Sequence, residues 1–142
     1  MSIETMKKNK VGIIGCGFIG TTKHLPSMSK IEGVEVVAFC DLIIERAQAA
    51  AEQYGVPDAL VCTDYKDVIA RDDIDVIHVC TPNNTHAEIT VAALKAGKHV
   101  MCEKPMAKTA AEAKAMLDAA KETGKLLTIG YQNRGYGLMT FK

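Results

Sequence analysis

The sequence lacks an excess of charge of either sign, because 17 basic residues are balanced by 17 acidic ones. A balanced chain has no electrostatic reason to bind nucleic acid or an anionic membrane, and we predict neither partner. It also lacks the run of about 18 apolar residues that a membrane-spanning helix requires. The basic residues at positions 7–10 precede a stretch that is interrupted by glycines and followed by no small-residue cleavage site, so they do not predict a signal peptide.

Closely spaced cysteine pairs are absent as well. The five cysteines are far apart and odd in number, without the spacing that a zinc site needs, and no metal site is predicted. We interpret them as small buried hydrophobic residues of a cytoplasmic protein in a reducing compartment. They are Cys16, Cys40, Cys62, Cys80 and Cys102.

No internal repeat or low-complexity linker divides the 142 residues, of which 48% are hydrophobic. A chain of this length forms one domain and buries roughly 68–70% of the surface that it exposes when unfolded. We expect a polar N-terminal lead over residues 1–9, a single domain over residues 10–134, and a short tail over residues 135–142.

Short apolar runs rich in β-branched residues alternate with helical patterns along the whole chain. Uninterrupted apolar strands are typical of a parallel sheet covered on both faces, so the chain is predicted to be an α/β protein with a doubly wound parallel sheet. A short segment at residues 59–62 leads into a helical turn at 64–70. The predicted strands cover residues 10–14, 34–40, 74–80, 98–102 and 126–130.

Capping residues and glycines predict where the helices begin and end. Thr85 with Glu88, and Thr109 with Glu112, have the spacing of a capping box, and Gly55, Gly97 and Gly124 follow three helical patterns. The helix after Gly20 contains Pro26 and is expected to kink or stop near His24, because an interior proline removes a hydrogen bond and clashes. The residues expected to face inward are Ile43, Ala47, Ala51 and Tyr54 in one helix and Ile89, Ala92, Ala93 and Ala96 in another.

The first predicted strand runs into Gly-x-Gly-x-x-Gly at Gly15, Gly17 and Gly20. In a strand-to-helix turn, the first glycine permits the tight turn, the second lets the backbone approach a pyrophosphate, and the third lets helix and strand pack closely. Phe18 and Ile19 complete this predicted cradle, in which phosphates accept hydrogen bonds from amides at a helix N-terminus. Taken alone, the pattern is equally consistent with an ordinary glycine-rich turn.

Asp41 follows the second strand, 21 residues after Gly20. An acidic residue at this distance accepts hydrogen bonds from the adenosine ribose of NAD and repels the 2′-phosphate of NADP. No arginine takes its place as a phosphate partner. We therefore predict NAD rather than NADP as the cofactor. The alternative is that Asp41 caps the helix expected to begin at Leu42, and both roles can coexist.

Polar residues also follow the other strands, where ligands of open parallel sheets bind. The loop Thr81-Pro82-Asn83 follows the third predicted strand, Glu103-Lys104-Pro105 the fourth, and Gln132-Asn133-Arg134 the last. His86 lies in the first turn of a helix at this edge, where packing and ligand contact are equally plausible. His78 and His99 fall within strands and are expected to be structural.

These motifs together resemble the glucose-fructose oxidoreductase, inositol dehydrogenase and MocA family. The resemblance runs from about Val11 to Arg134, and Glu103-Lys104-Pro105 after a Gly-Lys-His-Val strand is its most specific part. It implies a Rossmann domain in which Lys104 contacts the reacting carbinol oxygen and acts as the catalytic residue. Glu103 is implied near the cofactor ribose, and residues 81–83 beside the nicotinamide.

The resemblance also implies a second domain, which supplies the substrate pocket and the rest of the catalytic set. We therefore predict the NAD-binding domain of an oxidoreductase that transfers hydride to or from a sugar, inositol or similar polyol, and that is poorly active alone. The alternative is a non-catalytic module that senses NAD or pairs with another chain. The exposed last strand or the crevice is expected to support self-association.

Overall fold

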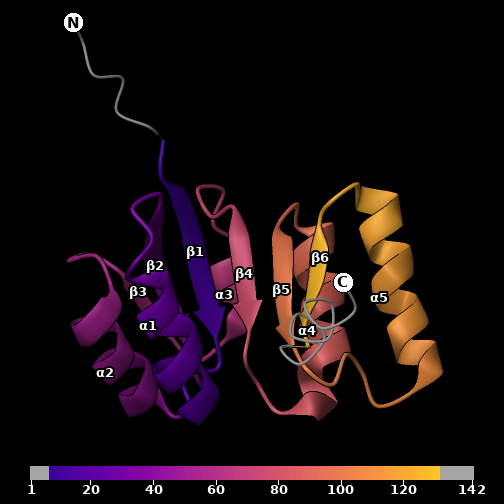
Figure 1. The fold of residues 1–142 in the computed structure, drawn as a ribbon, viewed down its shortest axis with the longest axis horizontal. Coiled ribbons are helices and arrows are strands. Elements are labelled where there is room, and N and C mark those ends of the chain that lie inside the picture. Colours follow the sequence, from indigo (N-terminus) through magenta and orange to yellow (C-terminus); the bar gives the residue numbers. More distant parts are fainter. Residues whose placement is uncertain (1–6, 132–142) are drawn as a thin grey trace, which may run out of the picture.

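The computed structural model describes residues 7–131, which form an α/β domain around one six-stranded parallel sheet (Figure 1). The strand order is β3-β2-β1-β4-β5-β6, and every neighbouring pair is parallel. This confirms the predicted fold class of a doubly wound Rossmann sheet. The strands are β1 (Asn9–Ile14), β2 (Val34–Cys40), β3 (Leu60–Cys62), β4 (Val76–Val79), β5 (His99–Glu103) and β6 (Leu127–Gly130).

The short segment expected at residues 59–62 is a strand of the sheet. Cys40 of β2 is in register with Cys62 of β3, so β3 extends the sheet beyond β2. β2 has the expected range, and the other strands differ from theirs by one or two residues at their ends. Ile74, expected within β4, instead lies buried in the turn before it.

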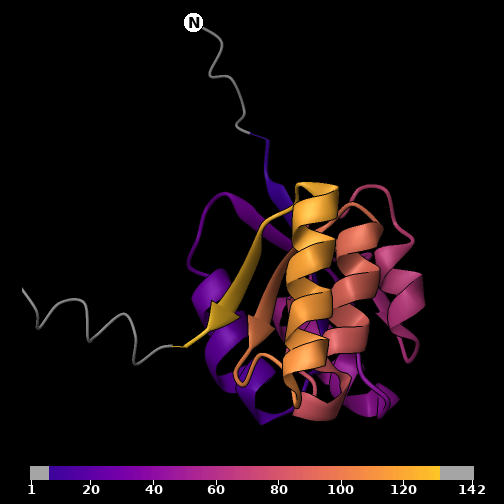
Figure 2. The same cartoon turned by 90° about the vertical axis from the view of Figure 1, so that its right-hand side faces the viewer.

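Helices cover the two faces of the sheet in two groups, as the perpendicular views show (Figures 1 and 2). On one face lie the π-helix η1 (Gly20–His24), α1 (Leu25–Met28) and α2 (Ile44–Tyr54). On the other lie α3 (Tyr65–Ile69), α4 (His86–Lys95) and α5 (Ala110–Thr123), with the 3₁₀ turn η2 (Asn83–Thr85) leading into α4. Within the described part of the chain, no helix covers β6 on the side of α1 (Figure 2).

The helix after the glycine turn continues past His24 as α1, so the alternative that it stops there is wrong. The Leu25 N–H donates to Gly20 O, an i→i−5 bond of π-helical type, and Pro26 then falls in the first turn of α1. Proline is tolerated in a first turn, because its missing N–H would have no partner there. The conflict at Pro26 is therefore relieved by a change of hydrogen-bond pattern.

The predicted capping box at Thr109 forms in part. Thr109 Oγ1 accepts a hydrogen bond from the Glu112 N–H, but the Glu112 carboxylate accepts from the Lys108 N–H, one residue before the position that completes the box. Thr85 does not cap α4, because its backbone already has the near-helical geometry of η2 (φ −112°, ψ −3°) rather than the extended geometry of a capping residue. Its hydroxyl donates within the loop instead, to Thr81 and to Pro82 O.

The expected inward faces of α2 and α4 are correct along the helices, including Ala51 and Tyr54, which pack partly buried against the core, and wrong at Ile43 and Ala96. Ala47 of α2 and Ile89 and Ala93 of α4 are buried. Ile43 is 46% exposed because it precedes the first turn of α2. Ala96 is exposed because it follows the last turn of α4.

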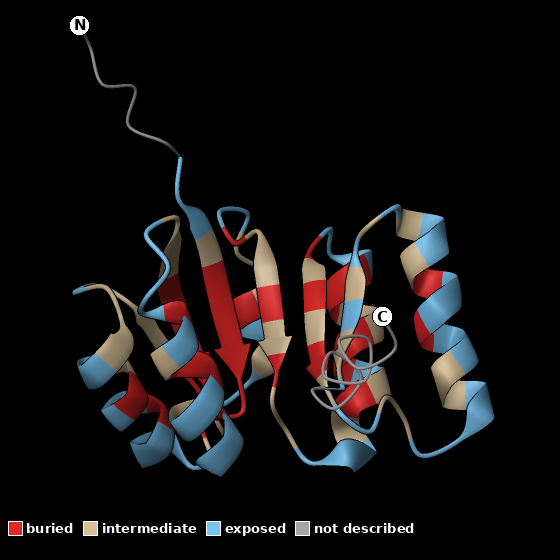
Figure 3. Cartoon of the chain, viewed as in Figure 1, coloured by how far each residue is buried: buried red, intermediate tan, exposed pale blue. Residues whose placement is uncertain are grey.

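Two apolar clusters lie on opposite faces of the sheet, and the buried residues follow the strands and the inner sides of the helices (Figure 3). Phe39, Ile13 and Leu25 are fully buried in the cluster beneath α1 and α2, whereas Leu94 and Met116 anchor the cluster beneath α4 and α5.

The five cysteines are free thiols, four of them buried and Cys80 half-buried. Burial raises the pKa of the Cys16 thiol to about 12. The interpretation of the cysteines as small hydrophobic residues is confirmed. Among the helices of residues 7–131, none is both long enough and apolar enough to cross a bilayer.

Candidate functional site

The turn after β1 is shaped by two glycines that have no room for a side chain. Gly15 has φ +97°, and a Cβ there would lie 2.5 Å from the backbone of Cys80. A Cβ on Gly20 would lie 2.7 Å from Gly15 O and 3.3 Å from Ile13 Cδ1. Gly15 therefore lets β1 turn against the end of β4, and Gly20 lets η1 pack directly on β1.

Gly17 has a different environment. A Cβ built on it would meet a single group, the Arg46 guanidinium, with Nη1 3.9 Å away. Its neighbours Phe18 and Ile19 are 77% and 36% exposed. Contacts within residues 7–131 therefore do not require a glycine at position 17, and the backbone there is open to approach from outside.

Asp41 ties the end of β2 to the glycine turn. Its Oδ2 accepts a hydrogen bond from the Cys16 N–H and its Oδ1 accepts one from the Ile43 N–H, both at 2.8 Å. The helix begins only at Ile44, so Asp41 holds the turn that precedes it rather than capping a helix at Leu42. Each carboxylate oxygen has two lone pairs, so both can still accept a hydrogen bond from a ligand.

A cleft of about 670 Å³ opens at the carboxyl ends of β1, β2 and β4. It has the size of a small-molecule site and lies where open parallel sheets bind ligands. Of the residues predicted from the sequence, Gly15, Gly17, Asp41, Thr81 and Pro82 line it.

The cleft is also lined by residues that the sequence patterns did not single out. Arg46 lies in the first turns of α2 and faces Gly17. Tyr65 donates a hydrogen bond to Glu88 Oε1 at 2.9 Å, and both residues line the side of the cleft formed by α3 and α4. Arg46 could have been identified from the sequence by its position about one helical turn after the loop that follows β2.

His86 has the packing role rather than that of a ligand contact. It is 1% exposed, with Nε2 2.8 Å from Thr81 O and Nδ1 2.7 Å from Pro105 O. Both partners are carbonyl acceptors, so a neutral ring donates to one of them and packs against the other. His86 therefore lies between the loops after β4 and β5, with both ring nitrogens against backbone carbonyls. Asn83 is exposed in η2 and does not line the cleft.

Glu103 ends β5, and Lys104 and Pro105 follow it at the same edge of the sheet. Glu103 Oε2 accepts a hydrogen bond from the Lys104 N–H at 3.1 Å, and Oε1 lies 2.5 Å from His24 Nε2. Lys104 is exposed. These residues lie outside the lining of the 670 Å³ cleft, beyond Thr81 along the edge. Gln132, also predicted from the sequence, lies outside the described residues.

The two strand histidines make contacts within the protein. His99 Nδ1 accepts a hydrogen bond from the Leu126 N–H at 3.0 Å, which confirms its structural role. His78 Nδ1 lies 3.0 Å from His24 Nδ1, and the two rings meet edge to face. Burial and the neighbouring His24 lower the pKa of His78 to about 4. His78 is therefore neutral at physiological pH.

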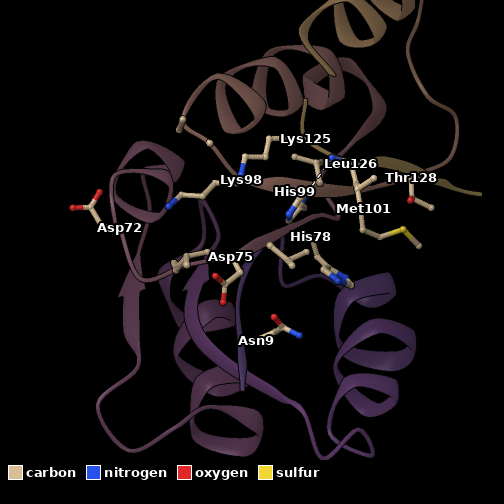
Figure 4. Close-up of a pocket in the computed structure, with 15 residues that line it drawn as sticks. Asn9, Asp72, Asp75, His78, Lys98, His99, Met101, Lys125, Leu126 and Thr128 are labelled. Carbon is tan, nitrogen blue, oxygen red and sulfur yellow. Dashed lines mark hydrogen bonds between the residues drawn. The ribbon is translucent and has the colours of Figure 1, made fainter. Parts of the chain in front are cut away.

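A second cavity, of about 760 Å³, lies across β4, β5 and β6 on the face without a helix (Figure 4). Asn9, Asp75 and Lys98 mark its floor near the amino ends of the strands. It faces away from the glycine turn and the loops that follow β4 and β5. The larger cavity is therefore not the one in which the sequence-predicted residues meet.

Comparisons with known proteins agree with the Rossmann fold of the described residues. The model of an oxidoreductase family with an NAD-binding Rossmann fold matches residues 9–131. An inositol 2-dehydrogenase of Salmonella typhimurium is 41% identical over 126 residues, which are 88% of this chain and 37% of that protein. A D-glucoside 3-dehydrogenase of Escherichia coli is 40% identical over 133 residues, 94% of this chain and again 37% of the relative. The chain thus spans little more than a third of the length of these relatives.

A solved structure extends the similarity to three dimensions. The crystal structure of a 3-ketoreductase from Actinomadura kijaniata in complex with TDP-benzene and NADP superimposes with a TM-score of 0.82 at 31% identity. The match covers 94% of this chain and 43% of that one.

Proposed function

The chain belongs to the oxidoreductase family with an NAD-binding Rossmann fold. We propose that the cleft at the carboxyl ends of β1, β2 and β4 binds NAD for hydride transfer to or from a polyol or sugar. The observation that carries the proposal is the meeting of Gly17 and Asp41 in one cleft. Gly17 offers backbone that a pyrophosphate can approach, and Asp41 offers a carboxylate already oriented by two amides.

The residues present fit a dinucleotide along the edge of the sheet. Arg46 beside Gly17 supplies a positive charge at the pyrophosphate position. Thr81 and Pro82 continue the edge toward β5, where Glu103 and Lys104 follow. The cofactor, when bound, supplies the hydride acceptor or donor, and the protein supplies the binding, the orientation and the electrostatics.

Lys104 is proposed as the catalytic residue. Removal of hydride from an alcohol carbon leaves developing negative charge on the oxygen, which an adjacent ammonium stabilises, and the hydroxyl proton needs a base. The exposed position of Lys104 after β5 leaves its side chain free to reach a substrate beside the nicotinamide. Replacing Lys104 with alanine should remove the residual turnover of the chain and leave NAD affinity within about twofold, since Lys104 lies outside the lining of the cleft.

The proposed preference for NAD over NADP follows from Asp41. A second negative charge at the 2′-phosphate of NADP would lie against its carboxylate. The similar 3-ketoreductase is in complex with NADP, so the preference belongs to this chain's own residues rather than to the fold. Calorimetry with NAD, NADH and NADP tests it: we expect NAD to bind roughly tenfold or more tightly than NADP, and equal affinities would contradict the assignment.

The substrate class is inferred from the names of relatives, which act on inositol and a glucoside. A polyol or sugar is therefore proposed for the complete active site. Assays of NADH formation with a panel of polyols test this class. The 142-residue chain is expected to turn over poorly, because it spans 37% of the relatives' length and their remaining residues are expected to supply the substrate pocket.

A further inference from the structure

Lys104 lies between two residues that buried histidines hold. Pro105 O lies 2.7 Å from His86 Nδ1, and Glu103 Oε1 lies 2.5 Å from His24 Nε2. His86 is 1% exposed and His24 is 9% exposed. The backbone on both sides of Lys104 is therefore attached to the rest of the domain through imidazole rings.

The contact with His24 connects two parts of the proposed site that are far apart in the sequence. His24 ends η1, the helix that begins at Gly20 of the glycine turn. Glu103 ends β5, and its second oxygen, Oε2, accepts a hydrogen bond from the Lys104 N–H. The Glu103 carboxylate thus joins the helix of the glycine turn to the backbone of Lys104.

His24 is itself oriented by His78. The His78 ring lies at the margin of the second cavity, beside the helix that follows the glycine turn (Figure 4), and its Nδ1 is 3.0 Å from His24 Nδ1. Because the depressed pKa keeps His78 neutral, its Nδ1–H can donate to His24 Nδ1. His24 then presents Nε2–H to the carboxylate.

The surroundings of the Glu103 carboxylate favour its contact with His24 Nε2. The side chain of Glu103 is 17% exposed and that of His24 is 8% exposed, so little water competes for the contact. A Cβ on Gly130 of β6 would lie 3.4 Å from Glu103 Oε1, so the neighbouring strand borders the carboxylate on its other side.

We propose that His24 is a positioning residue for Lys104, which it holds through the Glu103 carboxylate. The inference deepens the proposed function, since it assigns to His24 the placement of the proposed catalytic loop. It assigns His24 no contact with cofactor or substrate. His24 lies in the helix that follows the glycine turn, but its effect would then be on the position of Lys104 and not on the binding of the phosphates.

Two substitutions of His24 separate its contacts. In His24→Gln, the amide nitrogen occupies the position of Nε2 and keeps a donor toward Glu103. In His24→Asn, the side-chain amide reaches only the position of Nδ1, so the contact with His78 is kept and that with Glu103 is lost. Both variants carry a side-chain amide and differ in how far it reaches. Circular dichroism and the hydrogen exchange of the Ala113 amide in α5 monitor whether the fold is intact.

The first readout uses the ligand-free chain and needs no cofactor. The exchange of the Lys104 amide with water, measured by NMR, should be roughly tenfold faster in His24→Asn than in the wild type and nearly unchanged in His24→Gln. Equal exchange in the two variants would overturn the proposal. Glu103→Met, which is similar in length and has no oxygen to accept from the Lys104 N–H, should reproduce the Asn result if His24→Asn fails to fold.

The second readout compares NADH with ADP-ribose, which lacks the nicotinamide. His24→Asn and His24→Gln should both leave the affinities for NADH and for ADP-ribose within about twofold of the wild type, as is expected of Lys104→Ala for NAD, because His24 acts on the loop and contacts no cofactor. A loss of roughly tenfold or more for either ligand would show that His24 acts on cofactor binding or on the fold as a whole and overturn the positioning role. If the wild-type chain binds neither ligand, the proposed function fails, and the exchange of the Lys104 amide still decides the role of His24.

Discussion

Gly15 and Gly97 both have positive φ angles but differ in what surrounds them. A Cβ on Gly15 would lie 2.5 Å from the Cys80 backbone, whereas one on Gly97 would meet nothing within 4 Å. Gly15→Ala should lower the free energy of unfolding by about 2–5 kcal/mol, because strain and overlap add, and Gly97→Ala by about 1–2 kcal/mol from strain alone. Urea denaturation measures both, and equal losses would contradict the close approach at Gly15.

His78 should make stability depend on pH. Its pKa is lowered from 6.5 to about 4 in the folded protein, so the unfolded chain binds more protons between these values. The free energy of unfolding therefore falls as the pH falls through this window, by up to roughly 3 kcal/mol.

Denaturation curves of the wild type and His78→Asn between pH 7 and pH 4 test this dependence. Asparagine keeps a hydrogen-bonding group near His24 and has no basic nitrogen, so the variant should lose less stability on acidification. Parallel curves for the two proteins would exclude His78 as the source.

Residues placed by fixed spacing could be predicted from the sequence, and residues placed by long-range contact could not. The distance from Gly20 predicts Asp41, and the strand before Glu103 predicts the position of Lys104. The role of His24 depends on Glu103 and His78, which only the topology of the sheet brings to it. The sequence could not decide the role of His86, because a histidine that packs and one that contacts a ligand leave the same pattern at the start of a helix.

Among the elements, α5 has a side-chain cap that the structure confirms. Thr109 Oγ1 accepts from the Glu112 N–H at 3.1 Å. Thr109→Ala should lower the free energy of unfolding by about 1 kcal/mol, and Thr109→Ser, which keeps the oxygen, should change it by only a few tenths. Chemical denaturation measures the difference between these variants, and an alanine variant as stable as the serine variant would contradict the cap.

The elements that sequence patterns predicted best are those with a long apolar run or a left-handed glycine. β2 is one, and α5, which ends at Gly124 with φ +69°, is another. β3 has only three residues, too few to show a period, and its pairing with β2 makes it a strand. The η2 turn was missed because it changes the backbone of Thr85 without changing the capping pattern in the sequence.

At the scale of the whole molecule, β6 lies at the edge of the sheet formed by residues 7–131, and no described helix covers its face on the side of α1 (Figure 2). Leu126 beside it is 70% exposed and Tyr131 is 47% exposed. We therefore expect the domain to self-associate at this edge, with a mass that rises with concentration in light scattering. Leu126→Lys should shift the equilibrium toward monomer, and a wild-type monomer at high concentration would contradict the expectation.

The strand order also has a consequence for synthesis on the ribosome. β1 lies between β2 and β4, and the chain completes β2 and β3 before β4 leaves the ribosome. Until then, one backbone edge of β1, the strand that carries the glycine turn, has no partner from this chain. The nascent N-terminal half therefore exposes the unpaired backbone edge of an apolar strand, which is prone to wrong pairing until β4 emerges and covers it.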